Sequence, residues 1–296
     1  MKKYIFMLIL SLLMVGCAQP VEPVDDGSLT IMTTLFPQYD ISKHIVQDKA
    51  KVTLLLPPGV EAHDYEPTPQ DIVKLQNSDL FIYTSDHLET YASKMSKEIK
   101  NKDNVTINLS TQLELDSEDP HYWLVISNMI EMTNSITEEI VKLDPDNADF
   151  YRANRDAYIK DLQAVESELV DLMKYAKRDT IVFAGHFSFD YFASAYGMKY
   201  VTPFDSYSPN AEASPQRISK MIEYIREHDI KVVYYEELVD PKLAKMLASE
   251  TSVELLMLNA EHNVSKEQLD GHTTYSDIMR ENIKNLKVGL EYAKDN

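Results

Sequence analysis

A stretch without glycine or proline, residues 147–177, divides the chain near its middle. Its apolar residues recur at steps of three, four, five and seven, which is the spacing of one face of an α-helix. At a rise of 1.5 Å per residue it predicts a helical rod of roughly 46 Å, long enough to lie across two neighbouring domains. Because this stretch has no glycine-rich hinge, we expect any reorientation of the flanking halves to be small. The apolar residues are Phe150, Ala157, Leu162, Val165, Leu169, Leu172 and Ala176.

Short apolar, β-like runs alternate with helical patterns on both sides of this stretch. Such alternation predicts βα units and parallel sheets. The expected fold class is α/β, with two similar lobes, 29–146 and 178–296, joined by the 147–177 helix. The expected strands are 29–35, 51–56, 79–84 and 105–109 in the first lobe, and 180–185, 199–202, 230–235 and 253–258 in the second. The expected helices between them are 37–48, 69–77, 88–100, 187–196, 215–228, 241–250 and 273–293.

The N-terminus has the pattern of a secretory signal. Lys2 and Lys3 precede an apolar run that ends at Val15 and is too short for a typical membrane-spanning helix. The run leads into Met-Val-Gly-Cys, which resembles a bacterial lipobox and ends at Cys17, the only cysteine. We therefore predict a lipoprotein signal over 1–17, lipidation of Cys17, and a polar tether over 18–28 that holds the protein on the outer face of the cytoplasmic membrane. The alternative is an incidental thiol in an ordinary signal peptide.

The charge balance narrows the class of partner. The formal net charge of the chain is −19, and it becomes −21 when Lys2 and Lys3 leave with the signal. Binding to nucleic acid needs a basic surface, so we exclude it as a function. A surface this acidic attracts cations weakly and keeps the protein soluble, but salt screens the field within about 10 Å and the charge alone creates no site.

Three histidines each stand in a short polar turn directly after an apolar β-like run. They are His63 in PPGVEAHDYEPTP, His121 in EDPHYWL and His186 in IVFAGHFSFDYFA. Open α/β sheets bind ligands at the carboxyl ends of their strands. Imidazole is the commonest protein ligand for zinc, and three or four imidazoles suit a tetrahedral Zn²⁺ ion. The sequence therefore predicts one metal site built from distant loops.

The same segments carry a family resemblance over nearly all of the mature chain. The motifs PPGVEAHDYEPTPQDIVKLQNSDLFIY, DPHYWL, FAGHFSFDYFASAYGMKY and EASPQRISKMIEYIREHDIKVVYYEELVDPKLAKMLASET follow the signal in that order. Together they resemble the metal-specific solute-binding lipoproteins of ABC importers for zinc and manganese. The resemblance implies two α/β lobes joined by a rigid backbone helix, with one metal ion held in the cleft between the lobes. It also implies delivery of the metal to a membrane permease by what we expect to be a monomer.

The resemblance also implies a set of ligands. His63, His121 and His186 occupy the three family histidine positions, and the third position is a glutamate in manganese-type members. Because nitrogen-rich sites favour Zn²⁺ over Mn²⁺, we expect zinc as the bound ion. The fourth family ligand follows the last strand of the second lobe, where this chain reads LNAEHNVS. We rank His262 slightly ahead of Glu261 for that role, with His272 as a weaker third candidate.

Further residues have weaker support from the sequence. Carboxylates that accept the second N–H of a ligating imidazole fix its orientation, and Asp64, Glu66 and Glu212 are candidates for this role. Aromatic residues beside the motifs, namely Tyr65, Trp123, Phe187 and Tyr207, either shield the cleft or belong to the core. The remaining histidines, His44, His87 and His228, are expected on the surface.

The function that follows is reversible capture of Zn(II) outside the cytoplasm and its delivery to an importer. Because the ligands must be deprotonated, the affinity should fall at low pH. One alternative is a manganese-binding member of the same class. Others are a surface adhesin and a zinc-dependent hydrolase, since three histidines and a water also make a catalytic site. We expect no enzyme, because a fourth protein ligand would close the coordination sphere and the chain has no HExxH motif.

Overall fold

The computed structural model describes most of the chain after the predicted signal. The predicted signal and lipidation site at Cys17, and three site candidates, Asp64, Phe187 and Tyr207, lie outside the described residues. Among the helices that are described, none is both long and apolar enough to cross a bilayer. The described ranges are 27–63, 65–100, 103–115, 119–186, 188–204, 212–238 and 240–294.

The first lobe contains a four-stranded parallel sheet in the order β2-β1-β3-β4. Every residue of the central strand β3 and the second half of β1, Ile31–Thr33, are buried, as expected for strands covered on both faces. The strands are β1 (Leu29–Thr33), β2 (Ala50–Leu54), β3 (Leu80–Tyr83) and β4 (Val105–Asn108). The helices that follow the first three strands are α2 (Phe36–Val46), α3 (Pro69–Gln76) and α4 (Thr90–Lys97).

The second lobe repeats this plan. β5 pairs with β6 and β7 with β8, all in parallel, and a parallel bridge between Phe183 and Tyr234 joins the two pairs into the order β6-β5-β7-β8. The expected α/β class is confirmed, and all eight expected strands are present. The strands are β5 (Thr180–Val182), β6 (Lys199–Val201), β7 (Val232–Glu236) and β8 (Glu254–Leu258). The helices are α7 (Asp190–Ala195), α8 (Pro215–Glu227), α9 (Lys242–Thr251), α10 (Lys266–Asp270) and α11 (Tyr275–Gly289).

Several helices begin where the sequence supplies a hydroxyl cap. Thr68, Ser214, Ser265 and Thr274 each accept a hydrogen bond from the backbone N–H three residues later. This satisfies one of the N–H groups that a helix start leaves unpaired. Proline stands at the first position of α3 and α8, where its missing N–H is not needed.

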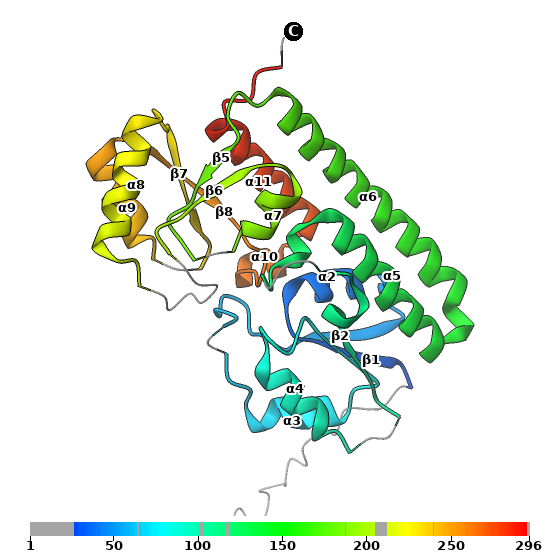
Figure 1. Ribbon diagram of the computed structural model, residues 1–296. Helices are drawn as coiled ribbons and strands as arrows, with labels where there is room; N and C mark the ends of the chain where they lie inside the picture. Colours follow the sequence, from blue (N-terminus) through cyan, green and yellow to red (C-terminus); the bar gives the residue numbers. More distant parts are fainter. Residues whose placement is uncertain are drawn as a thin grey trace, which may run out of the picture.

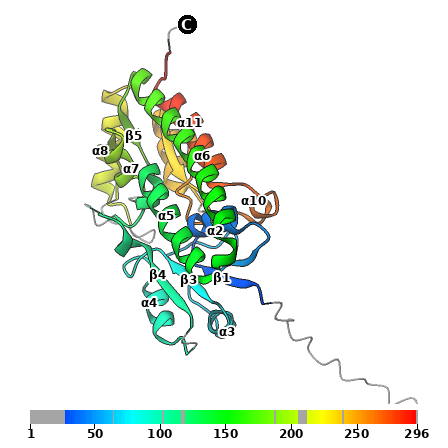
Figure 2. The ribbon, with the colours of Figure 1, turned by 90° about the vertical axis from the view of Figure 1, so that its right-hand side faces the viewer.

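The long helix α6 (Ala148–Tyr175) runs past both lobes (Figure 1). It contains 28 residues and follows a short 3₁₀ turn, Pro145–Asn147. Its buried stripe includes Leu162, Val165, Leu169 and Leu172, which are among the residues that predicted the helix. The helix packs against α2 and α5 of the first lobe and α11 of the second, so it braces the two lobes together (Figure 2).

Helix α5 (Ile126–Leu143), which contains 18 residues, was not expected from the sequence. It lies against α6 and follows the His121 motif (Figure 1). Met129, Met132, Ile136 and Ile140 form its buried face at steps of three and four. The short helix α10, which begins after the capping residue Ser265, was also not expected.

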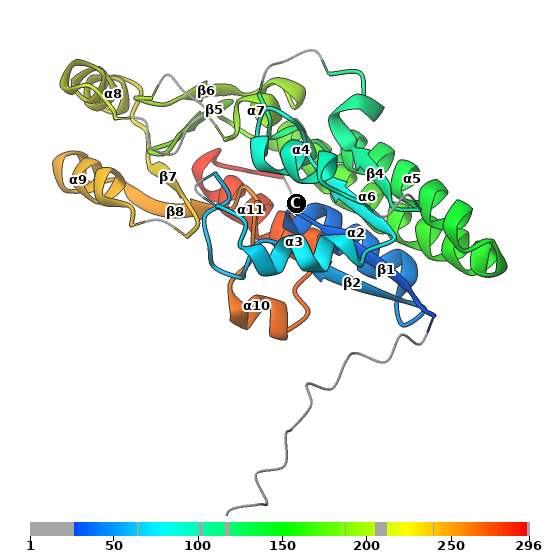
Figure 3. The same cartoon turned by 90° about the horizontal axis from the view of Figure 1, so that it is seen from below.

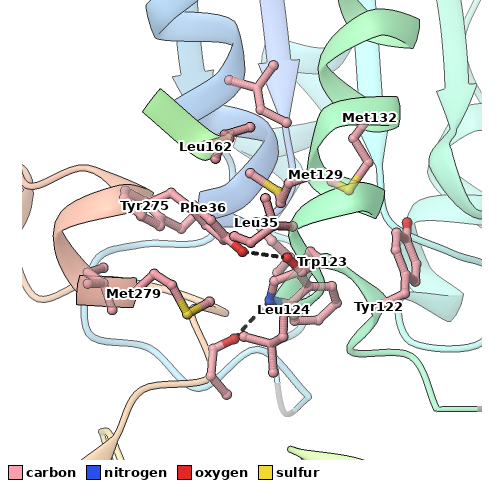
Figure 4. Close-up of a cluster of buried hydrophobic side chains, with 14 of the residues drawn as sticks. Leu35, Phe36, Tyr122, Trp123, Leu124, Met129, Met132, Leu162, Tyr275 and Met279 are labelled. Carbon is pink, nitrogen blue, oxygen red and sulfur yellow. Dashed lines mark hydrogen bonds between the residues drawn. The ribbon is translucent and has the colours of Figure 1, made fainter. Parts of the chain in front are cut away.

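The largest apolar core is continuous from one lobe to the other. Figure 4 shows part of this core. Tyr275 and Met279 of α11 lie there beside Phe36 of α2, Leu162 of α6 and Trp123, which belongs to the 3₁₀ helix Tyr122–Leu124. Two smaller cores lie beneath the outer helices, one under α8 and α9 and one under α3 and α4. In Figure 3, α8 and α9 lie at the opposite end of the molecule from α5 and α6. Because separating the lobes would expose the shared apolar surface, a wide opening is disfavoured.

The buried carboxyl group of Glu89 makes stability depend on pH. Glu89 is 1% exposed, and its Oε2 accepts hydrogen bonds from the N–H groups of Thr84 (2.6 Å) and Ser85 (3.3 Å). Burial outweighs these bonds and raises the pKa of Glu89 to about 7. The folded chain therefore holds a proton that the unfolded chain has lost, so stability falls as the pH rises from about 4.5 to about 7.

We expect Glu89→Gln to remove this loss. At pH 8 the variant should be roughly 2 kcal/mol more stable than the unsubstituted chain, because the gain of about 3 kcal/mol is partly offset by a buried amide N–H without a partner. At pH 4.5 and below, the advantage should vanish. Urea unfolding of the metal-free chain at both pH values measures the difference. The exposed Glu114→Gln is the control, and an equal effect of both substitutions would contradict the prediction.

Candidate metal centre

Four histidines from four separate loops meet at one point between the lobes. One side-chain nitrogen of each of His63, His121, His186 and His262 lies within 4.8 Å of the others. His63 is on the loop between β2 and α3, and His121 directly precedes the 3₁₀ helix Tyr122–Leu124. His186 follows β5 and His262 follows β8. Three of these loops continue from the carboxyl ends of parallel strands, which is where such sheets gather ligand-binding residues.

The imidazoles present buried Nε2 atoms to one another. His121, His186 and His262 are buried, and His63 is half-buried. The Nε2 atoms of His121, His186 and His262 are buried and have no hydrogen-bond partner among the described residues. Leaving buried polar atoms unpaired is unfavourable, so three of them facing one point indicate that a ligand completes the site. A metal ion that prefers nitrogen donors fits this arrangement.

Three carboxylates contact the Nδ1 atoms on the other side of these rings. Asp119 Oδ1 lies 2.6 Å from His121 Nδ1, and Glu236 Oε2 lies 2.6 Å from His186 Nδ1. Glu237 Oε1 lies 3.5 Å from His262 Nδ1. The Asp119 contact is a hydrogen bond, which fixes the orientation of the His121 ring and places its proton on Nδ1, so that the Nε2 lone pair is left for a metal. Glu236 and Glu237 place negative charge beside the other two rings.

These three carboxylates were not among those expected from the sequence. Of the expected carboxylates, Glu66 and Glu212 are exposed, and Asp64 is outside the described residues. A usable signal was present in the pair Glu236-Glu237 at the end of β7. Neighbouring strand residues point to opposite faces of a sheet, so two adjacent glutamates can reach two different ligand loops.

The local electrostatics favour neutral imidazoles. Burial lowers the pKa of His121 and of His262 well below its usual value, and neighbouring histidines in the cluster add to this effect. Burial also raises the pKa of Asp119 to about 6, although the N–H groups of His121 and Tyr191 partly oppose it. A neutral imidazole is the form that binds a metal, so the apo site is held ready for a cation.

Only one of the three candidates for the fourth ligand lies beside the other histidines. His262 joins them, with its ring centroid 5.2 Å from that of His63 and 4.8 Å from that of His121. Glu261 is fully buried elsewhere, and its carboxylate oxygens have no hydrogen-bond partner among the described residues. Burial, followed by the charges of Asp40 and Glu237, raises the pKa of Glu261 well above its usual value. His272 is exposed and borders a cavity of about 260 Å³ beside α2.

The only tryptophan of the chain forms one wall of the site. The Trp123 ring lies 5.4 Å from the ring centroids of both His121 and His262. Its Nε1 donates a hydrogen bond to the carbonyl oxygen of Ala260 (2.8 Å), and its own carbonyl accepts one from the Tyr275 hydroxyl (2.8 Å) (Figure 4). Trp123 thus connects a ligand of the first lobe to a ligand loop of the second.

The remaining aromatic residue and histidines discussed from the sequence, Tyr65, His44, His87 and His228, lie outside the four-histidine cluster. Tyr65 is half-buried and donates a hydrogen bond to Asp71 (2.8 Å). His87 and His228 are exposed, as expected. His44 is half-buried, because its ring packs on that of Tyr158 at 4.5 Å.

Comparison with known proteins links this geometry to metal uptake. Residues 31–289 match the family model described as zinc-uptake complex component A, periplasmic. The high-affinity zinc uptake system protein ZnuA of Bacillus subtilis is 36% identical over 281 residues, which cover 88% of each chain.

Two further similarities involve streptococcal proteins. The zinc-binding lipoprotein AdcA of Streptococcus pneumoniae is 30% identical over 308 residues. The match covers 97% of this chain but 61% of AdcA, so this chain spans less than two thirds of that relative. The crystal structure of the Zn(II)-bound ZnuA-like domain of the same AdcA superposes with a TM-score of 0.79 at 31% identity, covering 90% of this chain and 100% of the domain.

Proposed function

The chain belongs to the family of periplasmic zinc-uptake components A, and from that premise we propose that it captures Zn(II) outside the cytoplasm with His63, His121, His186 and His262 and delivers it to an ABC-type importer. The observation that carries the assignment of ligands is the convergence of four imidazole nitrogens within 4.8 Å. Four imidazoles match the tetrahedral coordination of zinc.

The donor set supports zinc over manganese. The cluster offers nitrogen donors, and the carboxylates Asp119, Glu236 and Glu237 contact the imidazoles from the outer side. Manganese prefers oxygen ligands, and its complexes stand at the weak end of the divalent series, whereas zinc is favoured by imidazole. These carboxylates also supply negative charge to balance the ion.

The fourth imidazole supports a binding protein over the zinc-dependent hydrolase. A catalytic zinc keeps one position open for water, which attacks the substrate. A fourth imidazole, that of His262, would fill this position. The family is a transport component, and we infer that this chain carries the ion without transforming a substrate. The adhesin alternative stays a prediction from the sequence.

The cellular setting extends the proposal. The family acts outside the cytoplasm, and we propose that acylated Cys17 anchors this chain to the outer face of the cytoplasmic membrane through the tether 18–28. A monomer would present the metal to the permease of the importer. The lobe limits 29–146 and 178–296, with 147–177 as the linking helix, belong to the same proposal.

Calorimetric titration of the chelator-stripped chain tests the choice of metal. We expect one zinc ion per chain, bound at least about a hundredfold more tightly than manganese, because the site lacks the oxygen donors that manganese prefers. A fresh metal-free sample titrated with Mn²⁺ provides the comparison, and calcium serves as a control for general attraction to the acidic surface. Equal affinities for all three ions would show that charge, and not a nitrogen site, is responsible for binding.

A further inference from the structure

The side chain of Asn263 joins the two loops that carry His63 and His262. Asn263 is fully buried. Its Nδ2 donates hydrogen bonds to the carbonyl oxygens of Pro57 (2.7 Å) and Val60 (2.9 Å) in the other lobe. Its Oδ1 accepts one from the N–H of Val264 (2.8 Å). The amide therefore has partners on both sides, and its orientation is fixed by them.

Backbone hydrogen bonds reinforce the same junction. The Gly59 N–H donates to the carbonyl oxygen of Val264 (2.8 Å), and the Phe36 N–H of α2 donates to that of His262 (3.1 Å). Gly59 has φ +79°, a left-handed conformation that glycine adopts without strain. The turn at Gly59 thus brings the carbonyls of Pro57 and Val60 to one side chain of the opposite lobe.

The loop held in this way carries the most accessible histidine of the cluster. His63 is half-buried, whereas His121, His186 and His262 are buried. It lies within 57–68, between β2 and α3, where the described residues form neither helix nor strand. A loop without regular structure owes its position to a few specific contacts, and local opening of such segments is the easiest motion of a protein.

We propose that Asn263 is a positioning residue that holds the His63 loop against the His262 loop and thereby sets the rate at which zinc leaves the site. The proposal rests on the proposed function. When the two bonds to Pro57 and Val60 open, His63 moves away while the other three imidazoles still hold the ion. A three-coordinate zinc ion has an open position at which an acceptor can bind it. Release then requires movement of one loop and leaves the shared core intact.

Two substitutions of the full mature chain test this role. Asn263→Ala removes the amide, and Asn263→Asp keeps its shape and its bond from Val264 N–H but cannot donate to Pro57 and Val60. We expect both to accelerate zinc dissociation at least about tenfold, which corresponds to about 1.4 kcal/mol. The measurement is stopped-flow transfer of zinc to excess chromophoric chelator. The aspartate variant is the sharper test, because its added negative charge would by itself slow the loss of a cation.

The matched control is Asn285→Ala. This amide also bonds to a backbone carbonyl, that of Met257 (2.8 Å), but it does so within one lobe and away from the His63 loop. We expect its zinc dissociation rate to stay within about twofold of the unsubstituted chain. Hydrogen exchange in peptides that contain Gly59 should speed up in the Asn263 variants, even without zinc, and stay unchanged in Asn285→Ala.

A double-mutant cycle with His63→Ala separates this role from general loosening of the structure. If Asn263 acts through His63, Asn263→Ala should have less than about a twofold effect once His63 is already absent. Equal acceleration in both backgrounds would overturn the proposal. If the unsubstituted chain binds zinc and the Asn263 variants release it at the normal rate, the role of Asn263 fails alone. If the unsubstituted chain binds no zinc, the proposed function fails first.

Discussion

Replacing either His186 or His262 with alanine is expected to weaken zinc binding by about a hundredfold to a thousandfold. Closed zinc sites bind with roughly 10–16 kcal/mol, so each of four ligands contributes about 2.5–4 kcal/mol, and 1.4 kcal/mol is a factor of ten. Both rings are buried, and each contacts a carboxylate. Competition with a fluorescent zinc chelator measures affinities of this strength.

The matched comparison for His262 is its neighbour. Glu261→Gln is expected to change the zinc affinity by less than about threefold, because the Glu261 carboxylate is buried outside the four-histidine cluster. The pair of variants therefore decides the fourth ligand. A large loss of affinity in Glu261→Gln together with a small loss in His262→Ala would reverse the assignment. His272→Ala, at an exposed position, is the second control.

The regular elements could be predicted from the sequence because each leaves a local pattern. The strands are short apolar runs bounded by turns, and α6 shows one apolar stripe without a glycine or proline. Helix α5 was missed because Thr133, Asn134 and Ser135 at its centre have low helix propensity. Tertiary packing overrides that preference, since Thr133 is buried and its hydroxyl donates a hydrogen bond to the Met129 carbonyl oxygen (2.7 Å).

The positions of the histidines along the chain were enough to predict where the metal site lies, but not its fourth ligand or the carboxylates around it. His63, His121 and His186 follow β-like runs, and the carboxyl ends of parallel strands meet at one edge of a sheet, so their convergence could be predicted. The choice between Glu261 and His262 depends on one backbone angle, because Glu261 has φ +61° and the turn sends neighbouring side chains in different directions. Glu236 escaped prediction for another reason. Glu236 lies far from His186 in sequence, and the parallel sheet brings them together.

The continuous core and the loops at the metal site suggest how the ion can leave. The apolar core continues across both lobes, and α6 braces them, so wide opening would expose a large buried surface. The loops at the site are instead joined by a few hydrogen bonds, which can open one at a time. Asp119 makes a similar connection, because its Oδ2 accepts a hydrogen bond from the N–H of Tyr191 at the start of α7 (2.8 Å). Hydrogen bonds that can open without disturbing the shared core therefore lie next to the ligands.

Trp123 is expected to contribute strongly to the stability of the fold. Trp123→Ala is expected to lower the free energy of unfolding of the metal-free chain by about 4–5 kcal/mol. Truncating a buried tryptophan costs about 3–5 kcal/mol, and the Ala260 carbonyl loses its donor as well. The side chain is fully buried where the two lobes meet. Its Nε1 donates a hydrogen bond to the Ala260 carbonyl oxygen, and the carbonyl oxygen of Trp123 accepts one from the Tyr275 hydroxyl, which Figure 4 draws as a dashed line. The second of these bonds involves only the backbone of residue 123 and survives the substitution.

Trp123→Phe separates packing from hydrogen bonding at this joint. It keeps an aromatic ring but removes the indole N–H, so we expect a loss of about 1–3 kcal/mol. Urea unfolding followed by circular dichroism measures both variants, since the chain has no other tryptophan to report by fluorescence. A loss below about 1 kcal/mol in Trp123→Ala would mean that the lobes are held together elsewhere. A loss near the expected value, with weaker zinc binding in both variants, would show that the same joint stabilises the fold and aligns His121 with His262.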